Sequence, residues 1–288
     1  MNFPIIDSHV HLWDKSNFHY AWLDQCPPLD QSFLLSELLD ATKNLHIESF
    51  VFIQSGCDSA QALDEVHWAA KLAERDHRIR GIVAHAPLEE GDEVLPYLMA
   101  LKEIPLVKGV RRVLHAETDD FCVQKNFITG VQLLSQFDFS FDISIYSRQL
   151  PAVIRLVEQS PQVNFILDHM GKPTISEGQL QEWQENLMRL ATLPNVWCKI
   201  SGLLSEANHQ IWRSDELKPY IFHAIETFGI QRVMFGSDWP MVNLGGSYSH
   251  WVHTLNDLIH HAPEKDWQKL FYENARQCYR LSSTVIEV

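Results

Sequence analysis

The sequence has few cysteines and no recognisable disulfide pattern. The 288 residues include five cysteines, an odd number, and none of them forms a Cys-x-x-Cys pair. Even numbers of regularly spaced cysteines are typical of small secreted domains, so this usage favours a reducing compartment. The opening residues, MNFPIIDSHVHLWD, also lack the basic start and the long apolar stretch of a signal peptide. We therefore expect a cytoplasmic protein.

Positive charge and long apolar runs are scarce as well. The net charge is −14, and no cluster of lysines and arginines interrupts the acidic composition. An acidic chain without such a cluster has no electrostatic attraction for nucleic acid or for an anionic membrane. No run approaches the roughly 18 apolar residues of a membrane-spanning helix. The expected partner is a small-molecule substrate, and the sequence leaves assembly into a homo-oligomer open.

Several common catalytic patterns are also absent. The chain contains no Gly-x-Ser-x-Gly of serine hydrolases, and no Gly-x-Gly-x-x-Gly of dinucleotide-binding folds follows its first apolar run. No cysteine ends an apolar run with a histidine partner nearby in the pattern, which argues against a thiol nucleophile.

What the chain does contain is an alternation of short apolar runs with helical patterns. The runs are rich in valine, isoleucine and phenylalanine, as is typical of strands buried on both faces. Helical patterns follow Asp58, Arg148 and Ser176. Eight repeats predict a parallel sheet closed into a (β/α)₈ TIM barrel, an α/β fold with one domain over 1–288; a doubly wound open sheet is the alternative. The eight runs lie at 3–8, 49–54, 79–85, 106–111, 139–145, 163–168, 196–201 and 232–237.

Two segments between these elements are long enough to cover one end of a barrel. Residues 12–30 form a long aromatic loop, and residues 239–247 form a second one. In a TIM barrel both would lie over the C-terminal mouth, where active sites are built. Tyr20 and Trp22 in the first loop can shape a substrate pocket, or they can simply pack the loop down.

The first and last runs end in polar residues. His9 and His11 alternate along a strand, so both are expected to face the same side, as half of a metal site would require. Asp238 follows the last run, which neighbours the first in a closed barrel, so it can complete the metal site or take a proton from water. The alternatives are polar residues at a strand-to-loop junction and an aspartate that favours a turn.

Other strand ends supply further candidates. His169 can be a metal ligand, a general acid or a donor to a developing oxyanion, whereas Asp168 is expected to point the other way and to be structural. Arg111 and Arg112 can orient a substrate carboxylate or carbonyl, although an ion pair with Glu117 is as good an interpretation. Weaker candidates are His85, Lys172, Lys199, Ser201 and Glu206.

The motifs IDSHVHLWD, KGVRR, LDHMGKP, CKISGL and MFGSDWP together resemble the amidohydrolase superfamily. They are most similar to its amidohydrolase-2 branch of sugar-lactone and 2-pyrone-4,6-dicarboxylate lactonases, from about Pro4 to Tyr279. The resemblance implies a distorted TIM barrel. It also implies that His9 and His11 match the family's strand-1 pair, His169 its strand-6 histidine and Asp238 its strand-8 aspartate.

Two departures from the wider superfamily limit what the resemblance implies. The run FDISIYSRQ offers no strand-5 histidine, and Lys108 stands at the start of its strand, so a binuclear centre with a bridging carboxylated lysine is not expected. The implied cofactor is one divalent metal, with zinc the leading candidate, or no metal. The implied reaction is hydrolysis of a lactone ester bond in a sugar acid or related carboxylic acid. The alternatives are a zinc-dependent decarboxylase or hydratase and a catalytically silent binder.

Overall fold

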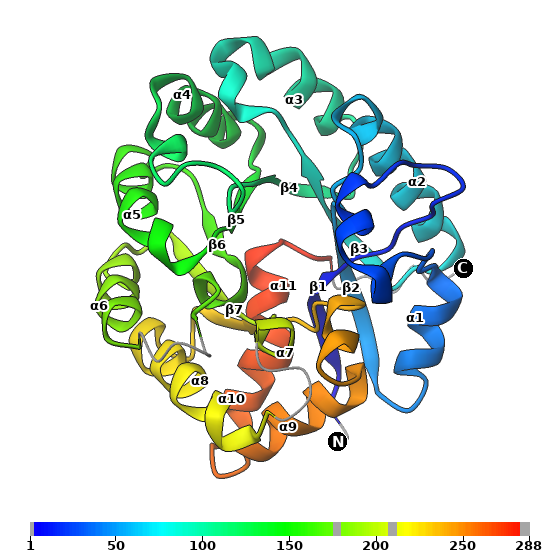
Figure 1. The fold of residues 1–288 in the computed structure, drawn as a ribbon, viewed down its shortest axis with the longest axis vertical. Coiled ribbons are helices and arrows are strands. Elements are labelled where there is room, and N and C mark those ends of the chain that lie inside the picture. Colours follow the sequence, from blue (N-terminus) through cyan, green and yellow to red (C-terminus); the bar gives the residue numbers. More distant parts are fainter. Residues whose placement is uncertain (1–2, 175–179, 207–211, 283–288) are drawn as a thin grey trace.

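Eight parallel strands form the barrel in this computed structural model, which describes residues 3–174, 180–206 and 212–282 (Figure 1). Each strand pairs with its neighbours in chain order, and a parallel bridge between Val10 and Trp239 brings the first strand to the last. The predicted TIM barrel is confirmed, because each predicted run overlaps one of the eight strands. The strands are β1 Ile5–Val10, β2 Ile47–Ile53, β3 Ile79–His85, β4 Val107–Val113, β5 Ser140–Ser144, β6 Phe165–Leu167, β7 Val196–Ile200 and β8 Val233–Phe235.

Helices surround the sheet in a ring (Figure 1). The apolar faces predicted after Asp58 and Arg148 are buried against the barrel in α2 and α5. Ser176 lies outside the described residues, and the helix expected after it begins at Leu180. None of the described helices has the length and apolar character needed to cross a membrane. The helices are α1 Leu35–Thr42, α2 Ala62–Arg75, α3 Leu95–Lys102, α4 Lys125–Leu133, α5 Leu150–Gln159, α6 Leu180–Ala191, α7 Leu203–Glu206, α8 Ser214–Phe228, α9 Tyr248–Leu258, α10 Glu264–Gln268 and α11 Asn274–Cys278.

The C-terminal segment closes one end of the barrel. Figure 1 shows α11 at the centre of the ring, and its residues pack with inward-facing side chains of the strands in a separate apolar cluster. Tyr279, just after α11, is buried in this cluster with Ile6 of β1 and Met234 of β8. A β-carbon on Gly81, at the start of β3, would lie 3.2 Å from Leu281, so the chain's end packs at the strands' beginnings. The opposite end of the barrel is therefore where strand-end side chains meet.

The first long loop is tied down by its own aromatic side chains. The Tyr20 hydroxyl donates to Glu65 of α2 at 3.2 Å, and Trp22 Nε1 donates to the Ser55 carbonyl at 2.9 Å. Tyr20 is buried, and the Trp22 ring packs edge-on against Trp13. Of the two interpretations of these aromatics, packing of the loop is the one that the contacts support.

Glu65 is a buried carboxyl that anchors this loop from inside. Burial raises its pKa to about 7, although the Ser55 N–H and the Tyr20 hydroxyl, which donate to it, act in the opposite direction. The native state therefore holds a proton that the unfolded chain releases near the ordinary value of 4.5. Between these two values the unfolded state binds fewer protons, so stability falls as pH rises through the window.

We expect Glu65→Gln to flatten this part of the pH dependence, because an amide does not ionise. Glu74→Gln is the matched control, since Glu74 is exposed on the same helix. The measurement is the free energy of unfolding in urea at pH 5 and pH 8, for the wild type and for both variants. An equal loss of stability with pH in Glu65→Gln and Glu74→Gln would contradict this assignment.

Candidate functional site

Four buried side chains from three strand ends converge at the mouth of the barrel. His9 and His11 come from β1 and the residue after it, His169 follows β6, and Asp238 follows β8. Asp238 Oδ1 lies 3.7 Å from His9 Nε2, 3.7 Å from His11 Nε2 and 3.8 Å from His169 Nε2. The sequence predicted this set of residues, and the structure brings them together around one carboxylate oxygen.

The backbone at two of these residues is unusual. His169 has φ 55° and Asp238 has φ 58°, a left-handed conformation that non-glycine residues rarely adopt. Backbone hydrogen bonds to the β1 end of the chain fix the turn at Asp238. The Asp238 N–H donates to the His9 carbonyl at 2.9 Å, and the His11 N–H donates to the Trp239 carbonyl at 2.8 Å. Such conformations persist where the surroundings determine them, and they concentrate at functional sites.

Asp7 of β1 joins this strand to the segment that follows β8. Its carboxyl accepts the N–H of His9 at 3.0 Å, the N–H of Ser237 at 2.8 Å and the Tyr248 hydroxyl at 2.8 Å. Burial raises its pKa to about 6 against these hydrogen bonds. Asp7 thus links β1 to the segment that carries Asp238.

The hydrogen-bond partners of the two β1 histidines define their tautomers. His11 Nδ1 lies 2.9 Å from the Ile53 carbonyl, which can only accept, so His11 Nε2 has a free lone pair. His9 Nε2, 3.1 Å from that lone pair, then donates to it. The Lys199 ammonium lies 3.1 Å from His9 Nδ1 and donates there. A continuous chain of donors therefore runs from Lys199 through His9 and His11 to the backbone of β2.

All three histidines are neutral in this environment. Burial, followed by the charge of Lys199, holds the pKa of His9 well below its ordinary value. Burial and Arg111 do the same for His11, and burial and His9 for His169. Neutral imidazoles can accept a metal ion or exchange hydrogen bonds, and they add no positive charge to the site.

The geometry of His9, His11 and Asp238 fits one metal ion. A tetrahedral zinc site with bonds of about 2.0–2.2 Å puts its ligand atoms roughly 3.3–3.5 Å apart. The observed separations of 3.1, 3.7 and 3.7 Å bracket that spacing. His9 would have to move its hydrogen from Nε2 to Nδ1, where the Asp168 carboxylate at 3.3 Å can accept it. His9, Asp168 and His169 form a second group with ligand atoms within 4.8 Å of one another.

A buried network of opposite charges lies directly beneath the histidines. Lys199 Nζ of β7 is 2.6 Å from Asp142 Oδ2 of β5 and 2.9 Å from Asp168 Oδ1. Arg111 Nη1 of β4 reaches Asp168 Oδ2 at 3.4 Å, and the Tyr279 hydroxyl donates to Asp142. Burial opposes the charge of Lys199, but Asp142 and Asp168 more than offset it and raise the pKa of the ammonium.

The prediction that Asp168 points away from the mouth is wrong. The alternation of side chains holds only while the strand continues, and β6 ends at Leu167. The left-handed turn at His169 and Met170 then lets Asp168 and His169 serve the same site from consecutive positions. Asp168 contacts His9, Lys199 and Arg111.

The two arginines of β4 have different surroundings. Arg111 is buried, donates to the Gln54 carbonyl at 2.7 Å and approaches His9 Nε2 at 3.4 Å. Arg112 instead pairs with Glu89 at 2.9 Å and Glu117 at 2.7 Å, so the ion-pair interpretation holds for it. Substrate contact through Arg112 is therefore not supported.

The remaining candidates lie around this centre. His85 is opposite Arg111 in the β3–β4 register, and burial with the charge of Arg112 lowers its pKa to about 4. Ser201 Oγ is 2.8 Å from His169 Nδ1, and Lys172 Nζ is 3.2 Å from Glu206 Oε1. These contacts orient site residues from neighbouring elements.

Sequence reasoning underrated Lys199 and missed Asp142. Each is the single charge in its strand, VWCKI and SFDIS, and both are fully buried. The argument that singled out Arg111 applies to them equally, because a buried charge requires a partner of opposite sign.

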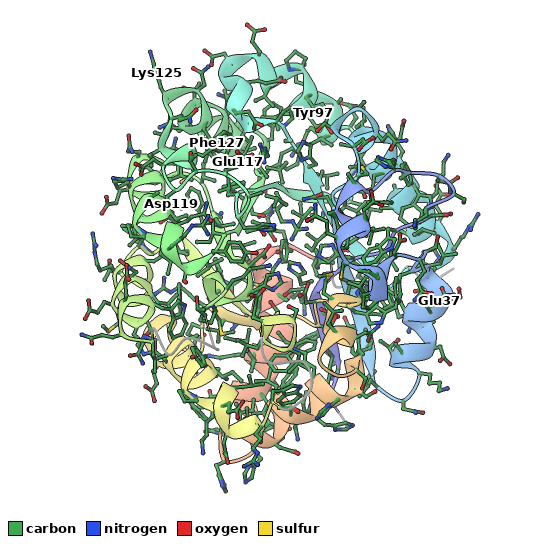
Figure 2. The ribbon with its side chains drawn as sticks, in the orientation of Figure 1. Glu37, Tyr97, Glu117, Asp119, Lys125 and Phe127 are labelled. Atoms are coloured by element: carbon green, nitrogen blue, oxygen red, sulfur yellow. The ribbon has the colours of Figure 1, made fainter. Side chains whose placement is uncertain are left out.

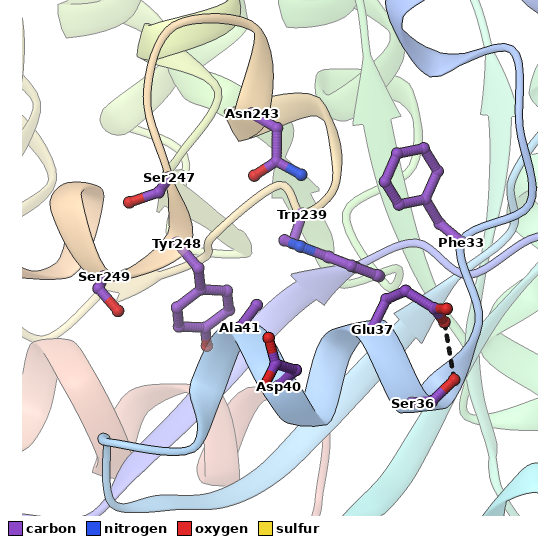
Figure 3. A pocket seen from close by; sticks show the side chains of 10 residues that line it. All are labelled: Phe33, Ser36, Glu37, Asp40, Ala41, Trp239, Asn243, Ser247, Tyr248 and Ser249. Carbon is purple, nitrogen blue, oxygen red and sulfur yellow. Dashed lines mark hydrogen bonds between the residues drawn. The ribbon is translucent and has the colours of Figure 1, made fainter.

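A separate cavity of about 450 Å³ lies outside the barrel, between α1 and α9 (Figure 3). It is lined by Phe33, Trp239 and Tyr248 together with the α1 carboxylates Glu37 and Asp40. Trp239 adjoins Asp238 in the chain, but none of the converging histidines lines this cavity. The strand-end cluster, and not this cavity, is therefore the candidate functional site.

Comparison with known proteins assigns the chain to a family. The amidohydrolase family model matches residues 6–281, so the chain belongs to the amidohydrolase family. It is 30% identical to an L-fucono-1,5-lactonase of Burkholderia multivorans, over 84% of each chain, and 26% identical to an L-fucono-1,5-lactonase of Burkholderia ambifaria, over 86% of this chain and 85% of the other. The crystal structure of a Burkholderia multivorans amidohydrolase with bound zinc is 28% identical, with a TM-score of 0.88 over 97% of this chain and all of the other.

Gly202 tests how tightly His169 is held. Its φ is +71°, and a β-carbon there would lie 2.5 Å from His169 Cγ and Nδ1. Gly229 has the same φ with nothing within 4 Å, so it is a control for the strain of a positive φ. Alanine at either position should cost on the order of 1–3 kcal/mol of unfolding free energy from this backbone conformation.

We expect Gly202→Ala to lose more stability than Gly229→Ala in urea unfolding, and to shift the His169 imidazole signals in NMR spectra. Gly229→Ala should leave those signals in place. Equal stability losses with unchanged His169 signals in both variants would show that this close contact does not position the histidine.

Proposed function

We propose that this member of the amidohydrolase family opens the ester bond of a lactone of a sugar acid or related carboxylic acid with an activated water. The observation that carries the proposal is the position of Asp238 Oδ1, 3.7–3.8 Å from the Nε2 atoms of His9, His11 and His169. The fold, the family and relatives named as lactonases support the same reaction. A cytoplasmic location remains a prediction from the sequence.

Asp238 is proposed to take the proton from the attacking water. Burial raises its pKa to about 7, with Lys172 and Arg111 acting in the opposite direction. A base whose pKa lies near neutral pH is partly deprotonated and still strong enough to accept a proton. Its side chain is almost completely shielded from bulk water, so the proton transfer occurs at a defined geometry.

His9, His11 and Asp238 are proposed to hold one divalent metal, with zinc the best candidate. When bound, such an ion lowers the pKa of water to about 7 and polarises a carbonyl. Support comes from the spacing of the three ligand atoms and from the zinc in the related Burkholderia multivorans structure. The chain's own residues then orient the lactone and move the proton.

His169 and Arg111 are proposed to bind the oxygen atoms of the lactone. If the Ser201 hydroxyl donates to His169 Nδ1, the hydrogen lies on Nε2, where it can donate to the carbonyl oxygen. Arg111 Nε is buried without a hydrogen-bond partner, so it too is available to a substrate oxygen. His85 is proposed to line the mouth beside Arg111, whereas Tyr20 and Trp22 act indirectly by packing the first loop.

Decarboxylation or hydration by a zinc centre is the second candidate reaction, and a silent binder is the third. The resemblance to the superfamily implies a strand-5 histidine in its decarboxylases, and β5, which reads SFDIS, has none. The charged residue of β5 is Asp142, whose carboxylate already binds the Lys199 ammonium and the Tyr279 hydroxyl. This arrangement favours hydrolysis.

We expect Asp238→Asn to lower kcat/KM for the lactone by about 10²- to 10⁴-fold, the usual contribution of a general base. The measurement is initial-rate lactone hydrolysis, corrected for spontaneous opening, with the unfolding midpoint as a check on folding. Asp119→Asn is the control, because Asp119 is exposed and pairs with Arg148 away from the cluster. Turnover near wild type in a folded Asp238→Asn would disprove the assigned role.

A further inference from the structure

The positive charges around the candidate site can be counted completely. The chain has 23 lysines and arginines, and none of them falls in the short segments outside the described residues. Arg111, Lys172 and Lys199 are the cations whose charges act on the pKa of His9, and the first two also act on Asp238. Lys125 is exposed and lies at the outer edge of the ring of helices (Figure 2).

Two of these three cations are neutralised inside the barrel. Lys199 contacts Asp142 and Asp168 at 2.6 and 2.9 Å, and Arg111 shares Asp168 at 3.4 Å. The four side chains are almost completely buried and form two cations against two carboxylates. The charges of both cations are therefore already balanced by carboxylates before a substrate binds.

The third cation, Lys172, is neutralised at the mouth itself. Its ammonium lies 3.2 Å from Glu206 Oε1 of α7, and both side chains are mostly shielded, at 17% and 23% exposure. The Lys172 backbone N–H donates to the His169 carbonyl at 2.9 Å, so the lysine is fixed to the turn that carries a site histidine. Glu206 ends α7, which begins directly after Gly202, and a β-carbon on Gly202 would lie 2.5 Å from the His169 ring. Both charges are thus carried by segments that adjoin this histidine.

The cations farther out are paired as well. Arg112 contacts Glu89 and Glu117, and Arg148 contacts Asp119 at 2.9 Å. A carboxylate-bearing substrate would therefore meet lysine and arginine side chains that are already paired, within a chain of net charge −14.

Two buried uncharged hydrogen-bonding groups, in contrast, have no partner among the described residues. They are Gln54 Nε2 and His115 Nδ1. The Gln54 carbonyl, just after β2, accepts from Arg111 of β4, so these two residues meet although β3 lies between their strands. Buried donors without a partner are costly, and the hydroxyl and ring oxygens of a polyhydroxylated lactone can satisfy them.

We propose that the Lys172–Glu206 pair makes this site selective for neutral, polyhydroxylated lactones over lactones that carry a carboxylate. Glu206 is a specificity-determining residue in this scheme, because it balances the charge of Lys172, the mouth cation that lies outside the buried network. The inference rests on the proposed lactone hydrolysis and goes beyond it by fixing the charge of the substrate.

The test compares matched lactones that differ only in one group. D-galactono-1,4-lactone ends in a hydroxymethyl group where D-galactaro-1,4-lactone has a carboxylate, and glucono- and glucaro-1,4-lactone form a second pair. We expect wild-type kcat/KM to favour the neutral member of each pair by at least about tenfold, the usual scale for an uncompensated charge. Glu206→Gln should raise kcat/KM for the carboxylate-bearing member about tenfold by releasing Lys172, with little change for the neutral one.

Glu117→Gln is the matched control, because it removes a rim carboxylate whose partner Arg112 still has Glu89. The gain in Glu206→Gln should also shrink as salt is added, as a charge effect must. If the wild type uses the carboxylate-bearing lactones equally well, or if Glu206→Gln changes the ratio no more than Glu117→Gln, the charge selectivity is refuted while lactone hydrolysis stands. If no lactone of either kind is opened, the proposed function fails and this inference with it.

Discussion

The contacts of one imidazole constrain the whole site. His9 receives a hydrogen bond from Lys199 on one side and faces His11 and Asp238 on the other. Its backbone is held by Asp7 and by the turn at Asp238. Because these partners come from β1, β7 and the segment after β8, the ring stays in place only if the barrel is closed. The contacts that position the His9 imidazole are therefore also contacts that join β1 to β7 and to the segment after β8.

Burying several charged groups is costly, and the structure compensates for it by pairing each buried cation with a carboxylate. A TIM barrel ordinarily fills its interior with layers of branched apolar side chains. Here Lys199, Arg111, Asp142 and Asp168 replace part of such a layer, and Tyr279 closes the network from the C-terminal segment. Breaking a buried pair of this kind exposes an uncompensated charge to a low dielectric, so its members depend on one another. The resulting rigidity holds neutral histidines ready for hydrogen bonds or a metal.

The sequence was informative where strand ends alone decide the arrangement. His9, His11, His169 and Asp238 follow apolar runs, and the closed parallel topology brings such positions to one mouth. It was less informative where the backbone leaves regular geometry: the left-handed turn at His169 turned Asp168 inward against the strand alternation. Long-range pairing was also beyond the pattern. Lys199 and Asp142 are 57 residues apart, and nothing local indicates that their side chains meet.

The central claim is that water opens a lactone at this cluster, and product identity tests it most directly. Protein of known metal content, with and without a chelator, is incubated with sugar lactones, and the products are followed by NMR. The account predicts a ring-opened hydroxy acid, formed faster than by spontaneous opening, with no carbon lost. Release of carbon dioxide from a carboxylate substrate, without lactone opening in any of these preparations, would contradict it.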